Sequence, residues 1–130
     1  MKPSPLNSEE APEEVPLSRV VLVVDDEPLV REVTASMLEE LGCEVITAAS
    51  GTEALQRLSS DRRIEILITD INMPEMDGYE LAERAQHMRE RLKVIALSGR
   101  EQDGSGLPFI RKPFLAQDLK AVMAQHTGLC

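Results

Sequence analysis

The sequence predicts an α/β protein in which five strands form one parallel sheet with helices on both of its faces. Two observations carry this prediction. Short aliphatic runs alternate with longer segments of helical periodicity along most of the 130 residues, and such alternation is typical of a parallel sheet. The first run, RVVLVV (19–24), shows no polar alternation, as expected of a strand that is buried on both faces.

Residues 1–18 differ from the rest of the chain in composition, because they contain four of the eight prolines and four glutamates. A segment with so little apolar surface cannot offset the entropy that it would lose on ordering. We therefore expect residues 1–18 to be a disordered, acidic, proline-rich tail and residues 19–130 to form one domain. The alternative is that the tail is a docking arm for a partner or for a second copy of the chain.

A first helix is expected to begin at Pro28, since proline is tolerated in the first turn of a helix. Gly42 is expected to end it. The apolar positions that follow helical spacing are Val30, Val33, Met37 and Leu41.

The second strand is expected at 44–48 (EVITA), and the third, EILIT (65–69), ends at Asp70. Between them, Ser50 and Glu53 have the spacing of a capping box at the start of a helix. The apolar residues of that helix are Ala54, Leu55 and Leu58.

Asp77 is expected to cap the third helix, whose apolar face is Leu81, Ala82, Ala85 and Met88. A fourth strand is expected at 93–98 and a short fifth strand at 108–112. The last helix is expected from about 115 to 126. Its inward residues are Leu115, Leu119, Val122 and Met123.

The expected strand order is 2-1-3-4-5, the flavodoxin-like arrangement, with right-handed crossovers. The segment between the fourth and fifth strands departs from this regular pattern. Residues 99–107 contain three glycines and no apolar helical face. The fourth helix of this doubly wound fold is therefore expected to be short or missing.

Polar residues stand where four of the strands end. Asp25 and Asp26 follow the first strand, Asp70 ends the third, Ser98 ends the fourth and Lys112 ends the fifth. In open α/β sheets the functional site lies beyond the carboxyl ends of the strands, at the point where the strand order reverses. These side chains are therefore expected to converge.

Three aspartates at one sheet edge repel one another unless cations compensate them. Lys112 and a divalent ion would do so, and Mg²⁺ prefers carboxylate, carbonyl and water oxygens. Phosphoryl transfer makes the same demand, since a metal and a cation must neutralise the transferring oxygens. A carboxylate can itself accept a phosphoryl group.

Four fragments at these strand ends, VLVVDDEP, ITDINMPEMDG, ALSG and IRKPF, occur in this order along the chain. Together they resemble the receiver domain of bacterial two-component response regulators, over about residues 19–126. The resemblance implies that residues 19–130 form such a receiver domain.

The resemblance implies that Asp70 is the phosphoacceptor. It also implies that Asp25, Asp26 and Asp70 hold Mg²⁺ or Mn²⁺ with the backbone carbonyl of Asn72. Asp26 and Asp70 are the expected direct ligands, and Asp25 is expected to act through water.

Ser98 and Lys112 are implied to bind the phosphoryl group, and the Lys112–Pro113 peptide bond is usually cis in this family. Ser98 and Phe109 stand where the family has its switch residues. A buried core aromatic is an equally weighted interpretation of Phe109.

The implied function is that of a single-domain response regulator. It would take a phosphoryl group from a sensor histidine kinase or a histidine phosphotransfer protein and signal to an unknown downstream protein by contact. The alternatives are a phosphotransfer intermediate or phosphate sink, or the C-terminal receiver of a hybrid histidine kinase. The short interval between Ser98 and Lys112 resembles receivers of hybrid kinases and some stand-alone regulators. No enzymatic activity is expected beyond self-phosphorylation and auto-dephosphorylation.

Charge and composition exclude several other classes. The formal net charge of −9 argues against binding nucleic acid or an anionic membrane. No apolar run approaches the ~18 residues of a membrane span, and no secretory signal is evident, so we expect a cytoplasmic protein. It is expected to be a monomer or a weak homodimer, and the sequence leaves the oligomeric state open. Cys43 and Cys130 form no disulfide framework or zinc motif.

Two enzymatic or cofactor-binding alternatives are disfavoured. A flavodoxin-like FMN protein would need a phosphate loop after the first strand, where Asp25, Asp26 and Glu27 would repel the phosphate. A phosphomonoester hydrolase with an aspartyl nucleophile normally has a second acid two residues later, and Asn72 stands there.

Overall fold

The computed structural model describes residues 19–99 and 106–127. The predicted tail (1–18), most of the segment between the last two strands (100–105) and Cys130 lie outside the described residues. The elements are β1 (Val20–Val24), α1 (Pro28–Glu40), β2 (Glu44–Ala48), α2 (Gly51–Ser60), β3 (Ile64–Asp70), α3 (Gly78–Met88), β4 (Lys93–Ser98), β5 (Phe109–Arg111) and α4 (Ala116–Thr127).

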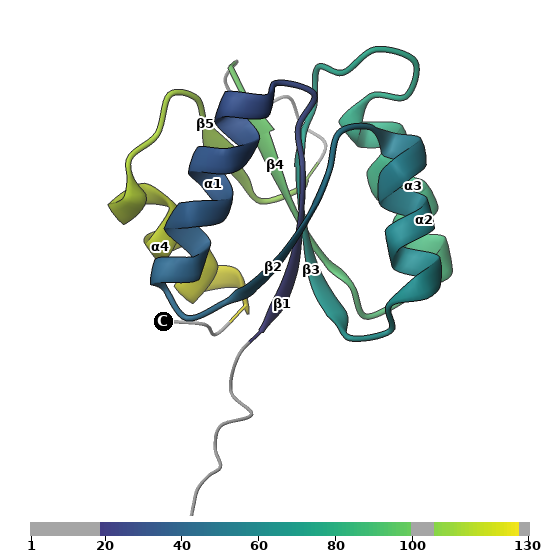
Figure 1. Cartoon of the computed structure of the whole chain (residues 1–130), viewed down its shortest axis with the longest axis horizontal. Coiled ribbons are helices and arrows are strands. Elements are labelled where there is room, and N and C mark those ends of the chain that lie inside the picture. Colours follow the sequence, from purple (N-terminus) through teal and green to yellow (C-terminus); the bar gives the residue numbers. More distant parts are fainter. Residues whose placement is uncertain (1–18, 100–105, 128–130) are drawn as a thin grey trace, which may run out of the picture.

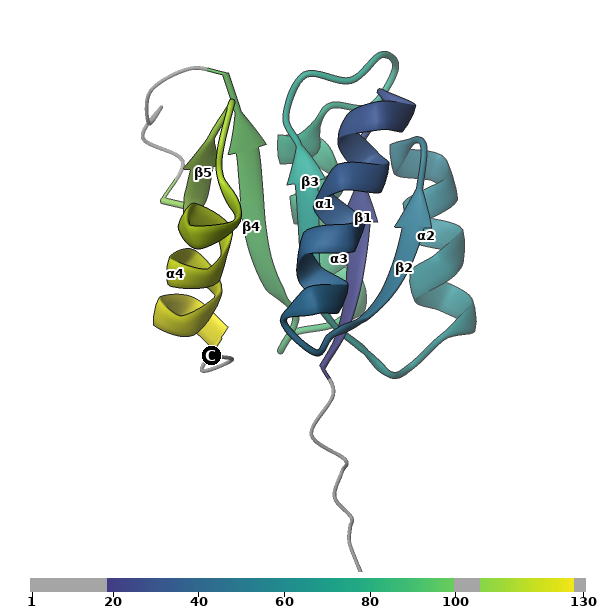
Figure 2. The same cartoon turned by 60° about the vertical axis from the view of Figure 1, so that its left-hand side comes forward.

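The five strands form one parallel sheet in the order β2-β1-β3-β4-β5. The predicted fold class and strand order are therefore confirmed. Helices α1 and α4 cover one face of the sheet, and α2 and α3 cover the other (Figures 1 and 2). All five strands point their carboxyl ends to the same edge, and this sets the place of the site.

Two aliphatic cores lie on the two faces, and β1 contributes to both. Leu22 and Val24 pack with residues of α2 and α3, whereas Val21 and Val23 pack with residues of α1 and α4. Every residue of β1 is buried. An uninterrupted β-branched run is what a central strand with two covered faces requires.

The predicted helix ends are confirmed. The Ser50 hydroxyl accepts from the Glu53 N–H at 3.1 Å, and the Glu53 carboxylate accepts in turn from the Ala49 N–H at 2.9 Å. Asp77 caps α3 by accepting from the N–H of Glu80 at 2.9 Å. Such side-chain acceptors satisfy N–H groups that have no partner within the helix.

The buried face of α1 differs from the prediction. Thr34 and Leu38 are its buried residues, whereas Val33 is 44% exposed. The Thr34 hydroxyl can be buried because it donates to the carbonyl oxygen of Val30 at 2.8 Å. A polar residue was therefore overlooked as a core position.

The prediction that Met88 and Leu115 belong to the core is also wrong. Met88 is 43% exposed and Leu115 is 63% exposed. Met88 is the last residue of α3, and Leu115 precedes the first residue of α4. Both lie at helix ends, beyond the turns that pack against the sheet.

Arg89, which follows α3, links the end of this helix to the end of α2 on the same face of the sheet. Its guanidinium group donates to carbonyl oxygens near the end of α2, in the connection that follows and at the start of β3, namely those of Leu58, Asp61, Arg62 and Ile64. Carbonyl groups at a helix C-terminus have no partner within the helix, so a cation there is stabilising.

Between β4 and β5 the described residues are Gly99 and 106–108, and none of them is helical. The prediction of a short or missing fourth helix concerns mainly 100–105 and stays a prediction. No helix within the described ranges is long and apolar enough to cross a membrane.

Candidate functional site

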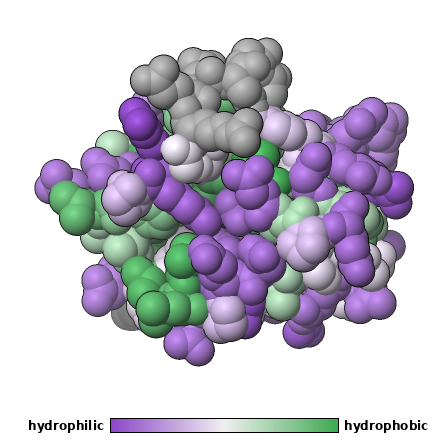
Figure 3. All heavy atoms as spheres, turned by 90° about the horizontal axis from the view of Figure 1, so that it is seen from above, coloured by the Kyte–Doolittle hydropathy of each residue, from purple (hydrophilic) through white to green (hydrophobic). Residues whose placement is uncertain are grey.

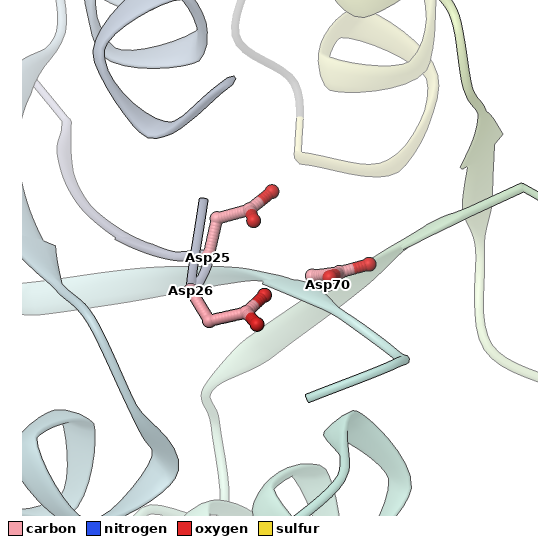
Figure 4. Close-up of side chains that lie close together, drawn as sticks. All are labelled: Asp25, Asp26 and Asp70. Atoms are coloured by element: carbon pink, nitrogen blue, oxygen red, sulfur yellow. The ribbon is translucent and has the colours of Figure 1, made fainter. Parts of the chain in front are cut away.

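Three carboxylates gather at the carboxyl edge of the sheet. Asp25 and Asp26 directly follow β1, and Asp70 is the last residue of β3. One carboxylate oxygen of each lies within 4.8 Å of the others. Figure 4 shows the side chains of Asp25 and Asp26 extending from adjacent positions toward Asp70. Because β1 and β3 are neighbours in the sheet, their ends bring these residues together as the strand order predicted.

The backbone beneath the site is still hydrogen-bonded between strands. The N–H of Asp25 donates to Ala48 at 3.2 Å, and the N–H of Ile71 donates to Leu97 at 3.0 Å. The N–H of Lys112 donates to the carbonyl oxygen of Ser98 at 2.7 Å. Each of these bonds lies one residue beyond a strand, so the residues of the site are anchored to the sheet.

Asp25 is fully buried, and each of its oxygens has a donor. Its carboxylate accepts from the N–H of Glu27 at 3.0 Å and from Nζ of Lys112 at 3.1 Å. Its carbonyl oxygen accepts from Nη1 of Arg31 at 2.7 Å. Asp26, in contrast, is exposed, so its carboxylate is the more accessible of the pair.

Lys112 is the cation of the site, with Nζ also 3.2 Å from Oδ1 of Asp70. Burial lowers the pKa of Lys112, but the hydrogen bond to Asp25 and the charges of Asp25 and Asp70 outweigh it and raise the pKa. The ammonium group therefore stays protonated at neutral pH. The Lys112–Pro113 peptide bond is cis, as the resemblance implied.

Burial raises the pKa of Asp70, Lys112 opposes this effect, and the charge of Asp25 adds to it, so that the pKa is raised overall. An ionised Asp70 is therefore incompletely compensated by the protein itself. A divalent cation beside it would supply the missing charge. The donor set of three carboxylates fits Mg²⁺ or Mn²⁺, which prefer oxygen ligands.

The remaining predicted residues lie on β4, on β5 and in the loop after Asp70. Ser98 is buried at the end of β4, next to the strand that carries Asp70. Asn72 is exposed in the loop that follows Asp70. Phe109 is half-buried at the start of β5, in register with Ala96. The roles of all these residues in metal binding, phosphoryl binding and switching stay predictions.

The sequence did not single out two residues that hold the site in place. Arg31 binds the Asp25 carbonyl, and Gly78 packs directly on the backbone of Asp70 and Ile71. In the sequence, these residues are marked only by their positions, an arginine one turn into the helix after Asp25 and Asp26 and a glycine directly after the capping Asp77. Neither position shows which backbone atom is contacted.

Comparison with known proteins gives a consistent result. The family profile described as "Response regulator receiver domain" matches residues 21–124. The chain is 42% identical over 79 residues to the sensor histidine kinase RcsC of Escherichia coli, a match that covers 61% of this chain and 8% of that protein. The chain thus spans less than a tenth of the length of this curated relative.

Two solved structures are similar to this fold. The receiver domain of the hybrid histidine kinase CckA has 36% sequence identity and a TM-score of 0.72, covering 82% of this chain and 96% of that one. The response regulator TrrA from Thermotoga maritima, solved in complex with Mg²⁺-BeF, has 33% identity and a TM-score of 0.75, covering 82% and 97%.

The profile match extends from within β1 into α4, so it includes residues of all five strands and all the strand ends that form the acidic site. The same strand order and the same carboxylate cluster were expected from the sequence motifs. The chain belongs to the response regulator receiver domain family of two-component signalling.

Proposed function

We propose that this chain is a phosphorylation-switched signalling domain that accepts a phosphoryl group on Asp70 from a histidine kinase or a histidine phosphotransfer protein. The observation that carries the proposal is the position of Lys112, whose ammonium group lies between Asp25 and Asp70 at 3.1 and 3.2 Å. A nucleophilic carboxylate, two further carboxylates and a fixed cation together meet the needs of phosphoryl transfer.

Mg²⁺ would be held by Asp26, Asp70 and the backbone carbonyl of Asn72. Asp25 would contribute through water, because both of its carboxylate oxygens already accept hydrogen bonds. The ionised carboxylates and Lys112 leave two negative charges uncompensated, and a divalent ion matches that charge. When bound, the ion neutralises oxygens of the transferring phosphoryl group.

In the transfer step, a carboxylate oxygen of Asp70 attacks the phosphorus of a phosphohistidine. The bond from phosphorus to the imidazole nitrogen breaks, and its electron pair returns to the imidazole. Lys112 and the Ser98 hydroxyl then hold oxygens of the phosphoryl group through charge-assisted hydrogen bonds. Movement of Ser98 toward the phosphoryl group, followed by Phe109, is the proposed switch.

The phosphodonor protein would dock beside this site. A groove of about 450 Å³ runs between α1 and the segment after β5, and Lys112 and Pro113 form part of its wall. On α1, Leu29 is 72% exposed and Val33 is 44% exposed. The view from above shows separate apolar patches among the polar side chains of this end of the molecule (Figure 3). An apolar helix face seated there would bring its histidine close to Asp70.

Two arrangements are compatible with this chemistry. Similarity to RcsC and to the CckA receiver favours a receiver that works as part of a hybrid kinase. Similarity to TrrA favours a separate response regulator. Phosphotransfer assays that use purified kinases and histidine phosphotransfer proteins as donors and acceptors distinguish a terminal regulator from a phosphotransfer intermediate.

The central experiment is labelling with acetyl phosphate in the presence of Mg²⁺, followed by intact-protein mass spectrometry. The wild-type chain should gain one phosphoryl group, and Asp70→Asn should gain none. Asp77→Asn is the matched control, since Asp77 is exposed and asparagine is an equally good helix cap. Stoichiometric labelling of Asp70→Asn would contradict the assignment of the acceptor.

A further inference from the structure

The carbonyl oxygen of Asp25 needs a donor from outside the sheet. Strand pairing of β1 ends at Val24, which is in register with Ala48 and Thr69. Asp25 follows directly and is fully buried. A buried carbonyl without a donor is costly, and Nη1 of Arg31 supplies that donor at 2.7 Å.

Arg31 makes two hydrogen bonds to residues 25–27, the acidic segment after β1. Its backbone N–H donates to the carbonyl oxygen of Glu27 at 3.0 Å, the first helical bond of α1. Its side chain reaches back to Asp25, two residues earlier than Glu27. The loop that carries Asp26 is therefore enclosed between two hydrogen bonds made by one residue.

We propose that Arg31 is a positioning residue for the metal site, which acts through the Asp25 carbonyl to fix the directions of the Asp25 and Asp26 carboxylates. The inference rests on the proposed function, because it requires a divalent ion at Asp26 and Asp70. Groups that orient metal ligands typically change metal affinity by about 10- to 100-fold when they are removed.

The sign of the effect separates positioning from simple charge. Arg31 carries a positive charge near a cation site, so its removal should tighten Mg²⁺ binding if charge alone matters. Loss of the hydrogen bond to Asp25 should instead weaken binding, because the carboxylates lose their fixed direction. A merely structural role would lower stability and leave the affinity of the folded protein unchanged.

The test is an Mg²⁺ titration of the full chain, followed by the amide NMR shifts of residues 25–27 and 70–72. Arg31→Met removes the donor and the charge, and Arg31→Lys keeps one donor and the charge. Arg84→Met is the matched control, because Arg84 pairs with Glu80 on the exposed side of α3 and its loss changes the net charge equally. Urea unfolding of each variant verifies that the titrated protein is folded.

Arg31→Met is expected to bind Mg²⁺ about tenfold more weakly than the wild type. Arg31→Lys should lie between the two, and Arg84→Met should match the wild type. Equal or tighter binding by Arg31→Met, or equal weakening by Arg84→Met, overturns the proposal and leaves the proposed function standing. If Arg31→Met does not fold, Arg31→Leu, which also lacks both the donor and the charge, gives the same comparison, with weaker binding in support and equal or tighter binding against. No Mg²⁺-dependent shifts at these residues in the wild type would instead refute the proposed metal site, and the role of Arg31 with it.

Discussion

Gly78→Ala should damage the fold at the acidic site, whereas the same change at Gly51 should not. Both glycines are buried first residues of helices, and both follow a capping side chain. A Cβ added at Gly78 would lie 2.8 Å from Cα of Ile71 and closer still to the carbonyl oxygen of Asp70. A Cβ at Gly51 would meet the flexible side chain of Met76, with Sδ at 2.6 Å.

The size of each change in unfolding free energy depends on whether the atoms that the new Cβ meets can move. Carbon atoms pack at about 3.5 Å or more, so at Gly78 the backbone around Asp70 and Ile71 or the start of α3 must shift by at least roughly 0.7 Å. Overpacking of this kind costs about 1–3 kcal/mol. Met76 can rotate away from Gly51, and alanine is favoured over glycine in helices by up to ~1 kcal/mol. These two effects oppose each other, so the unfolding free energy of Gly51→Ala should stay within about 0.5 kcal/mol of the wild-type value.

Urea unfolding followed by circular dichroism measures both free energies. Mg²⁺ titration of the folded variants then tests whether the shift reaches the site, and only Gly78→Ala should bind more weakly. If Gly78→Ala is as stable as Gly51→Ala, the backbone of Asp70 is not tightly packed against α3. In that case Gly78 does not lie close enough to the Asp70 backbone to exclude a Cβ.

Three further predictions concern the charges. The pKa of Asp70 is higher in the folded protein than in the unfolded chain, so the folded protein loses stability as the pH rises from the unfolded-state pKa through the folded-state pKa. In metal-free buffer, Asp70→Asn should therefore raise the unfolding free energy more at pH 7 than at pH 3. An equal increase at both pH values would contradict the raised pKa. Lys112→Ala leaves buried Asp25 without its cation and should cost about 3 kcal/mol in EDTA, partly restored by Mg²⁺; no recovery with Mg²⁺ would count against a shared site. Arg89→Met should lower the unfolding free energy by about 2 kcal/mol, because its four hydrogen bonds to carbonyl oxygens are lost. The exposed Arg84→Met should lower it by at most ~0.5 kcal/mol, and urea unfolding measures both.

The strand order and the acidic cluster were accessible from the sequence because both depend on local patterns. The run 19–24 identifies a central strand by itself. Once the strands are ordered, the polar residues that end them must share one edge of the sheet. Asp25, Asp26, Asp70 and Lys112 therefore come together by topology alone.

Helix faces and side-chain clamps were less accessible. Thr34 was overlooked on α1 because its hydroxyl bond to Val30 cannot be seen in an apolar pattern. Arg31 and Arg89 act on backbone carbonyls, and no sequence spacing encodes such a contact. The close approach of Gly78 to Asp70 depends on how α3 docks against the sheet, which only three-dimensional packing determines.

The hydrogen bonds that continue past the strand ends have a thermodynamic consequence. Because the N–H groups of Asp25, Ile71 and Lys112 bond to neighbouring strands, these three residues cannot leave the edge of the sheet without breaking hydrogen bonds between strands. A ligand that binds only when these residues are in place therefore stabilises the whole folded domain against unfolding, and its binding adds to the free energy of global unfolding. Saturation at 100 times the dissociation constant would raise the unfolding free energy of the whole domain by about 2.7 kcal/mol. Thermal denaturation is therefore a direct measure of occupancy at this edge of the sheet.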